Sequence, residues 1–207
     1  MLFKPSMWIG QVWPTSRARS YSLSGLRAVR YTGLLSPRRK RKFAVLYCFF
    51  VIDHDRRRIL HLNVTQNPSA PWVALQLRQT WAYDQRQRFL IFDRDAKFNA
   101  DVVATVEDYG MRPMRTALPS PWQNFIAERW VGSVRRDLLD HVIVVNQRHL
   151  RRLMKNYLRY YQEDRTHLGL GKDTPGGRVA ASASPIGSKV ISWPRLGGLH
   201  HRYAAAA

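Results

Sequence analysis

The chain has 207 residues and 45% of them are hydrophobic, which is enough for one domain with a packed core. Lys and Arg (34) outnumber Asp and Glu (14), so the formal net charge is +20 and the pI is near 11.1. This balance favours a polyanion as partner, most simply nucleic acid, with an anionic membrane surface as the competing partner. The longest apolar run, residues 43–52, is too short to cross a bilayer as a helix.

The distribution of acids divides the chain into three parts. All 14 acids lie between Asp53 and Asp173, so both ends are purely basic. We expect residues 1–42 to be a basic, irregular leader unrelated to the core, with strand character only at 28–35. Residues 43–173 form the mixed-charge core, and the Gly, Ala, Ser and Pro content of 174–207 predicts a flexible tail. The single cysteine, Cys48, excludes an internal disulfide.

The first part of the core predicts a hairpin followed by a helix. Residues 43–52 are typical of a buried strand, and 58–64 alternate, with Leu60, Leu62 and Val64 on one face. The acids and the histidine between them, at 53–55, are more simply turn residues than a metal cluster. A helix is expected at 70–81.

A second group of elements separates two acids. Residues 89–92 predict a short buried strand that ends at Asp93, followed by a helix at 100–109, Gly110 as its terminator and a strand near 111–116. Ser120 and Pro121 then have the pattern of an N-cap and first helical residue. The helix they would start places Glu128 about two turns in, beside an apolar face of Ile126, Trp130, Val134 and Leu138. Taken alone, Asp93 and Glu128 would be a turn acid and an exposed helix carboxylate.

The last helix is strongly amphipathic. Asn146 is its expected N-cap, and Leu150, Met154, Tyr157 and Tyr161 hold helical spacing. The opposite face carries Arg148, Arg151, Arg152, Lys155 and Arg159. That stripe indicates either a contact with the DNA backbone or a solvated helix face.

These motifs together resemble the integrase core of insertion-sequence transposases and retroviral integrases, the DDE polynucleotidyl transferases. Residues 93–98 resemble the family's D-x-G-x-x-F motif, with Asp95 in place of glycine. Residues 120–128 resemble S-P-x-x-N-G-x-x-E, with Phe125 in place of glycine, and 34 residues separate the two acids, one fewer than usual. An element of tyrosines followed by Arg165, His167 and Leu170 extends the resemblance, which covers roughly 43–203.

The resemblance implies an α/β fold, a ribonuclease H-like mixed sheet flanked by helices. It implies metal-dependent phosphodiester chemistry on DNA, with Mg²⁺ or Mn²⁺ held by Asp93 and Glu128 as catalytic and metal-binding residues. The DNA-binding candidates beside them are Lys97, Arg115, Asn124 and Arg135. The same resemblance implies a cytoplasmic, nucleoid-associated bacterial protein and a possible homo-oligomer on DNA.

One family feature is absent from this sequence. The family's first aspartate would fall at Leu34, about nine residues before Phe43, and no acid precedes Asp53. We therefore expect impaired catalysis, with a non-catalytic basic DNA-binding remnant as the alternative function. Asp53 and Asp55 are expected to lie at the far end of the following strand, too distant to share an ion with the other acids.

Overall fold

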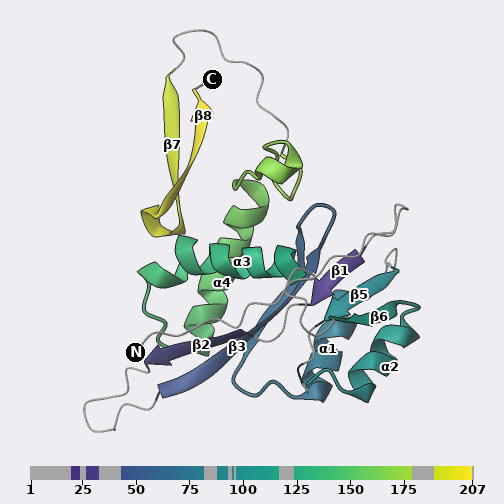
Figure 1. The fold of residues 1–207 in the computed structure, drawn as a ribbon. Coiled ribbons are helices and arrows are strands. Elements are labelled where there is room, and N and C mark those ends of the chain that lie inside the picture. Colours follow the sequence, from purple (N-terminus) through teal and green to yellow (C-terminus); the bar gives the residue numbers. More distant parts are fainter. Residues whose placement is uncertain are drawn as a thin grey trace, which may run out of the picture.

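The computed structural model describes residues 20–23, 27–32, 43–81, 88–92, 95, 97–116, 124–178 and 189–206. Its main sheet is built on the long strand β3 (Phe43–Asp53), which runs through the middle of Figure 1. β1 (Ser20–Leu23) and β2 (Arg27–Thr32) pair antiparallel with successive parts of one edge of β3. β4 (Ile59–Thr65) pairs antiparallel with its other edge.

Two parallel strands extend the sheet beyond β1. β5 (Phe89–Phe92) pairs with β1, and β6 (Arg112–Arg115) pairs with β5. The described sheet is therefore mixed, with an antiparallel half made by β1 to β4 and a parallel half made by β1, β5 and β6. This arrangement confirms the expected α/β class.

The sheet reaches into the stretch that the sequence assigned to a separate leader. β2 overlaps the strand expected at 28–35, but β1 was not expected. β1 is the strand that joins the two halves of the sheet, because it pairs with both β3 and β5. The core sheet thus includes residues before position 43.

β3 is buried on both faces, which explains its unbroken apolar sequence. Leu46, Phe50 and Ile52 pack in one core cluster, while Phe49 and Val51 pack in a second cluster on the opposite face. All five are fully buried.

A β-bulge changes the expected alternation of β4. Ile52 pairs with Ile59 and Val51 pairs with His61, so Leu60 is an extra residue in the ladder. Ile59 is consequently buried in the same cluster as Val64, whereas Leu60 is 37% exposed. The expected strand is confirmed, but placing Leu60 on the same face as Val64 was wrong.

Two helices cover one face of the sheet. α1 (Ala70–Thr80) begins after Ser69, whose side chain accepts a hydrogen bond from the Trp72 N–H, and α2 (Ala100–Asp108) is capped in the same way by Asn99. Both helices pack in the cluster that contains Phe49. The expected terminator Gly110 has φ of +67°, a conformation that glycine adopts without strain.

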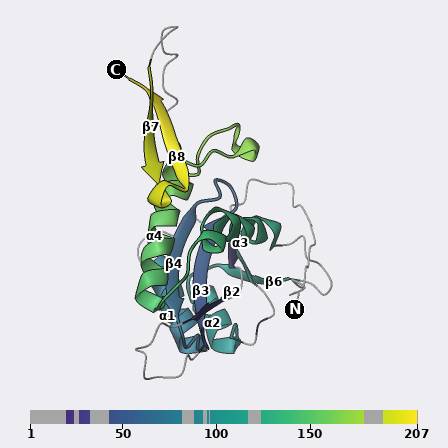
Figure 2. The same ribbon diagram turned by 90° about the vertical axis from the view of Figure 1, so that its left-hand side faces the viewer.

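Two further helices cover the opposite face (Figures 1 and 2). α3 (Phe125–Asp137) buries Ala127, Trp130 and Val134, and α4 (Gln147–Glu163) packs against the same cluster. α4 is capped by Asn146, as expected: its Oδ1 accepts the His149 N–H at 2.8 Å. Among the described residues, no helix is both long and apolar enough to cross a membrane.

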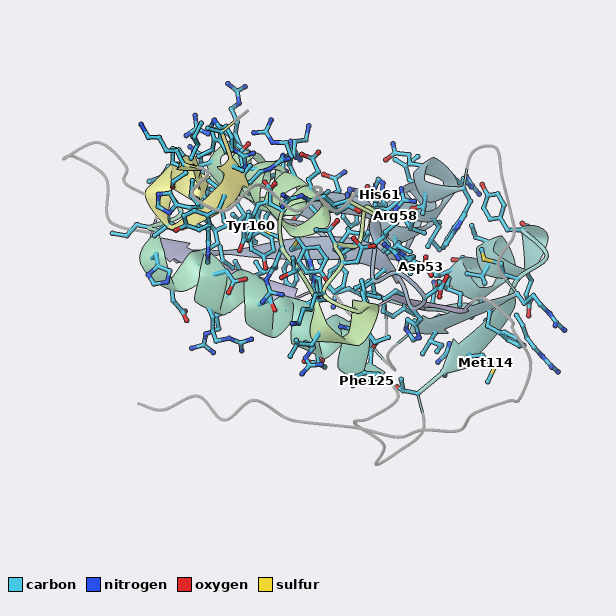
Figure 3. The ribbon with its side chains drawn as sticks, turned by 90° about the horizontal axis from the view of Figure 1, so that it is seen from above. Asp53, Arg58, His61, Met114, Phe125 and Tyr160 are labelled. Carbon is cyan, nitrogen blue, oxygen red and sulfur yellow. The ribbon has the colours of Figure 1, made fainter. Side chains whose placement is uncertain are left out.

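The part expected to be a flexible tail contains a β-hairpin. β7 (Val190–Arg195) and β8 (His200–Ala205) pair antiparallel and stand at the C-terminal end of α4 (Figure 2). Asp164, with a side chain only 2% exposed, accepts a hydrogen bond from Arg195 Nε at 2.5 Å and lies 3.5 Å from Arg202 Nη1. Tyr160 stacks on His200, and Figure 3 shows it beside the yellow ribbon of the hairpin.

Candidate active site

The sequence predicts a site at the end of β5, and β1 ends beside it. These strands are parallel and in register, with Ser22 opposite Ile91 and Leu23 opposite Phe92. In α/β sheets, functional groups gather at the carboxyl ends of parallel strands. Asp93 directly follows Phe92 in the sequence, although it lies outside the described residues.

The second predicted acid, Glu128, lies in the first turn of α3 and is exposed. α3 is in contact with β1, so the helix that carries Glu128 adjoins the strand beside β5 (Figure 1). A carboxylate in the first turn is also favoured by the positive end of the helix dipole.

The expected start of this helix lies outside the described residues. The described helix has Asn124 at its N-cap and Phe125 as its first residue, whereas Ser120 and Pro121 lie outside the described residues. Asn124 is buried and makes no side-chain capping bond. Glu128 is the fourth residue of the described helix, and the start expected at Ser120 stays a prediction. The apolar face is confirmed, with Trp130, Val134 and Leu138 buried.

The strand next to β5 carries no carboxylate. β1 consists of Ser20, Tyr21, Ser22 and Leu23, and the first acid of the whole chain is Asp53. The sequence placed the missing acid at Leu34, which is outside the described residues. The structure instead makes β1 the strand that lies between β3 and β5.

Asp53 does not replace the missing acid. It pairs with Tyr21, which in turn pairs with Leu90, so Asp53 lies two strands away from β5 and before the level of its end. Two strand spacings alone are roughly 10 Å. Its Oδ1 accepts the Asp55 N–H at 3.1 Å, and its own N–H donates to the Arg58 carbonyl at 2.8 Å, as in a hairpin turn (Asp53 and Arg58 are labelled in Figure 3).

The described carboxylates do not form a divalent-metal site. In the part of the chain that the structure describes, no group of three or more His, Cys, Asp or Glu residues could hold an ion. Two-metal phosphodiester chemistry needs several carboxylate oxygens around the ions. Of the two predicted metal ligands, Asp93 and Glu128, only Glu128 is among the described residues.

The basic DNA-binding candidates have protein contacts of their own. Lys97 Nζ lies 3.1 Å from both carboxylate oxygens of Asp95, and Arg115 donates to the Phe98 carbonyl at 2.8 Å. Arg135 pairs with Asp140 at 3.2 Å but keeps 73% of its side chain exposed. These contacts leave Arg115 and Arg135 on the surface, and a role of Lys97, Arg115, Asn124 and Arg135 in DNA binding stays a prediction.

The sequence did not predict how the end of the core docks on the β3–β4 turn. Arg56 Nη2 donates to Asp173 Oδ2 at 2.5 Å and to the Thr174 carbonyl at 2.8 Å. The Arg57 guanidinium lies close against Gly169, and a Cβ added there would make this side chain shift. The glycines that follow residue 168 are the feature of the sequence that could have indicated a close approach of the backbone here.

A partly buried network of side chains lies under the element at 157–170. Asp137 accepts hydrogen bonds from Tyr157 Oη and Arg165 Nε, both at 3.0 Å. His167 is 8% exposed and packs edge-on against Tyr161. Its pKa is lowered to about 4, first by burial and then by the charges of Arg165, Arg57 and Arg129. His167 is therefore neutral at pH 7 and acts as a core residue.

The comparisons with known proteins agree with this geometry. Residues 109–175 match the family model described as Integrase core domain. That segment includes β6, α3, α4 and the element at 157–170. No curated protein matches the sequence.

Solved structures of integrase cores share the fold at low sequence identity. The catalytic core domain of BIV integrase has a TM-score of 0.53 and 14% identity over 76% of this chain and 90% of that one. The HTLV-2 integrase catalytic core, a dimeric form in complex with magnesium, has a TM-score of 0.55 and 8% sequence identity. The match covers 76% of this chain and 93% of that one. A third similar structure is a chain of the simian T-cell lymphotropic virus intasome in complex with PP2A regulatory subunit B56 gamma. Its TM-score is 0.58 and its sequence identity is 13%, over 95% of this chain and 70% of that one.

The family match covers the predicted Glu128 helix, and the structural likeness covers most of the chain. The mixed sheet with helices on both faces is the ribonuclease H-like arrangement expected from the motifs. Residues 109–175 therefore resemble the integrase core family, and the chain has the fold of integrase catalytic cores.

Proposed function

We propose that this chain is a DNA-binding protein of transposase lineage whose metal-dependent strand-transfer chemistry is impaired. The observation that carries the proposal is β1: it lies in parallel register beside β5, where the family's first aspartate is expected, and its sequence is Ser-Tyr-Ser-Leu. The rest of the core fold is present around it.

DNA as the substrate class is supported by charge and by the family. The net charge of +20 favours a polyanion, and backbone phosphates attract such proteins whatever their sequence. One of the structural neighbours belongs to an intasome and another is a dimeric form. By analogy, we propose that this chain acts on DNA and assembles on it as a homo-oligomer. We also propose that it is associated with the nucleoid in a bacterial cytoplasm.

Mg²⁺ or Mn²⁺ is the cofactor that this chemistry would use. The metal would stabilise charge on the attacking and leaving oxygens of a phosphodiester. Asp93 and Glu128 would supply two carboxylates, and the third ligand has no counterpart on β1. This shortage is the reason for expecting weak or absent catalysis.

The second candidate is a non-catalytic DNA-binding remnant, which the same observation favours. It differs from the first in that no condition restores phosphodiester chemistry to the natural chain. Both candidates predict salt-sensitive DNA binding.

A nicking and strand-joining assay on duplex DNA tests the proposal, with Mg²⁺ or Mn²⁺ present and Glu128→Gln and Asp93→Asn as controls. The expected result is DNA binding with little or no metal-dependent product. A trace of product that both substitutions abolish supports the impaired enzyme, and no product supports the remnant. Vigorous joining that both substitutions abolish would contradict impairment, and absence of DNA binding would contradict both candidates.

A further inference from the structure

The exposed face of α4 carries a straight row of cations. Arg148, Arg152, Lys155 and Arg159 are all exposed, and their spacing of four, three and four residues keeps them on one side of the helix. At 1.5 Å per residue the row is roughly 16 Å long. The opposite side of α4 is anchored in the core by Leu150, Met154, Tyr157 and Tyr161.

None of these four cations forms an ion pair with another residue that the structure describes. Their neighbour Arg151 has a different role, because its Nη2 donates to the Val64 carbonyl at 2.9 Å. Like charges one turn apart repel each other, so an unneutralised row costs helix stability. An anionic partner on this face would remove that cost.

The row continues into a cleft beside the C-terminal hairpin. Arg152 and Arg159 line a cavity of about 960 Å³ whose other walls are the 138–142 segment and the 194–199 turn of the hairpin. Arg195 lines the same cavity, which has Glu163 as its one acidic lining residue among the described ones. No acid follows Asp173 in the sequence, so the hairpin adds only positive charge. Figure 2 shows the hairpin standing directly beyond the end of α4.

We infer that the exposed face of α4 and the β7–β8 hairpin form a binding track for the phosphate backbone of duplex DNA, separate from the strand ends near Glu128. This inference rests on the proposed DNA-binding function. One DNA strand carries a charge every 3.4 Å along the helix axis, so a row of roughly 16 Å faces about five phosphates. The row on α4, which contains three arginines and one lysine and no acid, is complementary in charge to this line of phosphates.

The track separates DNA positioning from the candidate metal site. Asp164 holds Arg195 and Arg202 and thereby fixes the hairpin against the end of α4. The row on α4 then positions the duplex without using any candidate ligand of the metal site. Binding through this track is expected to need no divalent metal.

The test measures DNA affinity against salt for the full chain, by fluorescence anisotropy with a labelled duplex of about 30 base pairs in EDTA. Arg152→Ala with Arg159→Ala is expected to reduce the slope of log K against log salt by about 1.8, which is 0.9 for each lost phosphate contact. Arg152→Lys with Arg159→Lys is expected to keep the slope, because charge is retained. The matched control is Arg78→Ala with Arg112→Ala: both are exposed, and they lie on α1 and β6.

Circular dichroism melts of all variants establish that they are folded. Equal slopes in the α4 variant and the Arg78/Arg112 control would overturn the track while leaving DNA binding intact. Tighter binding to phosphatidylserine vesicles than to DNA at equal phosphate would overturn it in favour of a membrane surface. If the natural chain binds no DNA at low salt, the proposed function itself fails.

Discussion

Replacing Trp130 by alanine is expected to lower the free energy of unfolding by about 3–5 kcal/mol. Trp130 is 2% exposed, its ring centroid lies 4.1 Å from that of Phe50 and it meets Tyr161 edge-on. It therefore joins α3 to both β3 and α4 in one core cluster. The substitution removes the side chain that fixes the Glu128 helix on the sheet.

Urea unfolding followed by circular dichroism measures this loss, with Trp193→Ala as the matched control. Trp193 lies on β7 and is 40% exposed, so its removal is expected to cost less than about 1 kcal/mol. Similar losses for the two tryptophans would show that α3 does not pack on the sheet as described.

Replacing Asp164 by alanine is expected to detach the hairpin and cost about 3 kcal/mol, because it leaves two arginines without their buried partner. Asp164 is nearly inaccessible, whereas Arg195 and Arg202 keep 31% and 38% of their side chains exposed. Because the arginines are partly exposed, we expect a loss of unfolding free energy at the lower end of the range for removing one partner of a buried ion pair.

Hydrogen–deuterium exchange of residues 190–205 and urea unfolding together check this expectation. Asp140→Ala breaks the exposed pair with Arg135 and is expected to cost less than about 0.5 kcal/mol without changing exchange in the hairpin. Unchanged protection of β7 and β8 in Asp164→Ala would mean that the hairpin is held in place by other contacts.

Elements with strong local signals were predictable from the sequence. β3 is an uninterrupted apolar run, α2 ends at a glycine with positive φ, and α4 combines an Asn N-cap with regular apolar spacing. In each case the pattern lies within the element itself, so no knowledge of its neighbours was needed.

Elements that depend on distant pairing were not predictable. Ser20–Leu23 has no marked apolar pattern and becomes a strand by pairing with β3 and β5, which lie far along the chain. The bulge at Leu60 is part of the register with β3, and the C-terminal hairpin contacts the buried Asp164, which lies far from it in the sequence. Tertiary contacts outweigh local propensity at these places.

The candidate site was predictable only in part, for the same reason. Glu128 was proposed from a motif and stays a prediction, whereas the helix that carries it is confirmed. The identity of the strand beside β5 was not evident, because it is fixed by pairing and its own sequence carries no acid. The expected position of the missing carboxylate consequently moves from Leu34 to β1.

The central claim is that this core lacks one carboxylate on β1, and Mn²⁺-dependent nicking by first-strand variants tests it most directly. Ser22 pairs with Ile52, a residue of the core cluster beneath α3, and with Ile91 of β5. Ser22→Asp is expected to raise nicking by about tenfold or more over the natural chain, and Glu128→Gln should abolish the gain. Leu23 pairs with Phe92, which packs in the core cluster on the opposite face of the sheet, so Leu23→Asp adds the same charge and is expected to give no gain. Nicking that stays at the natural level in a folded Ser22→Asp variant would contradict the claim.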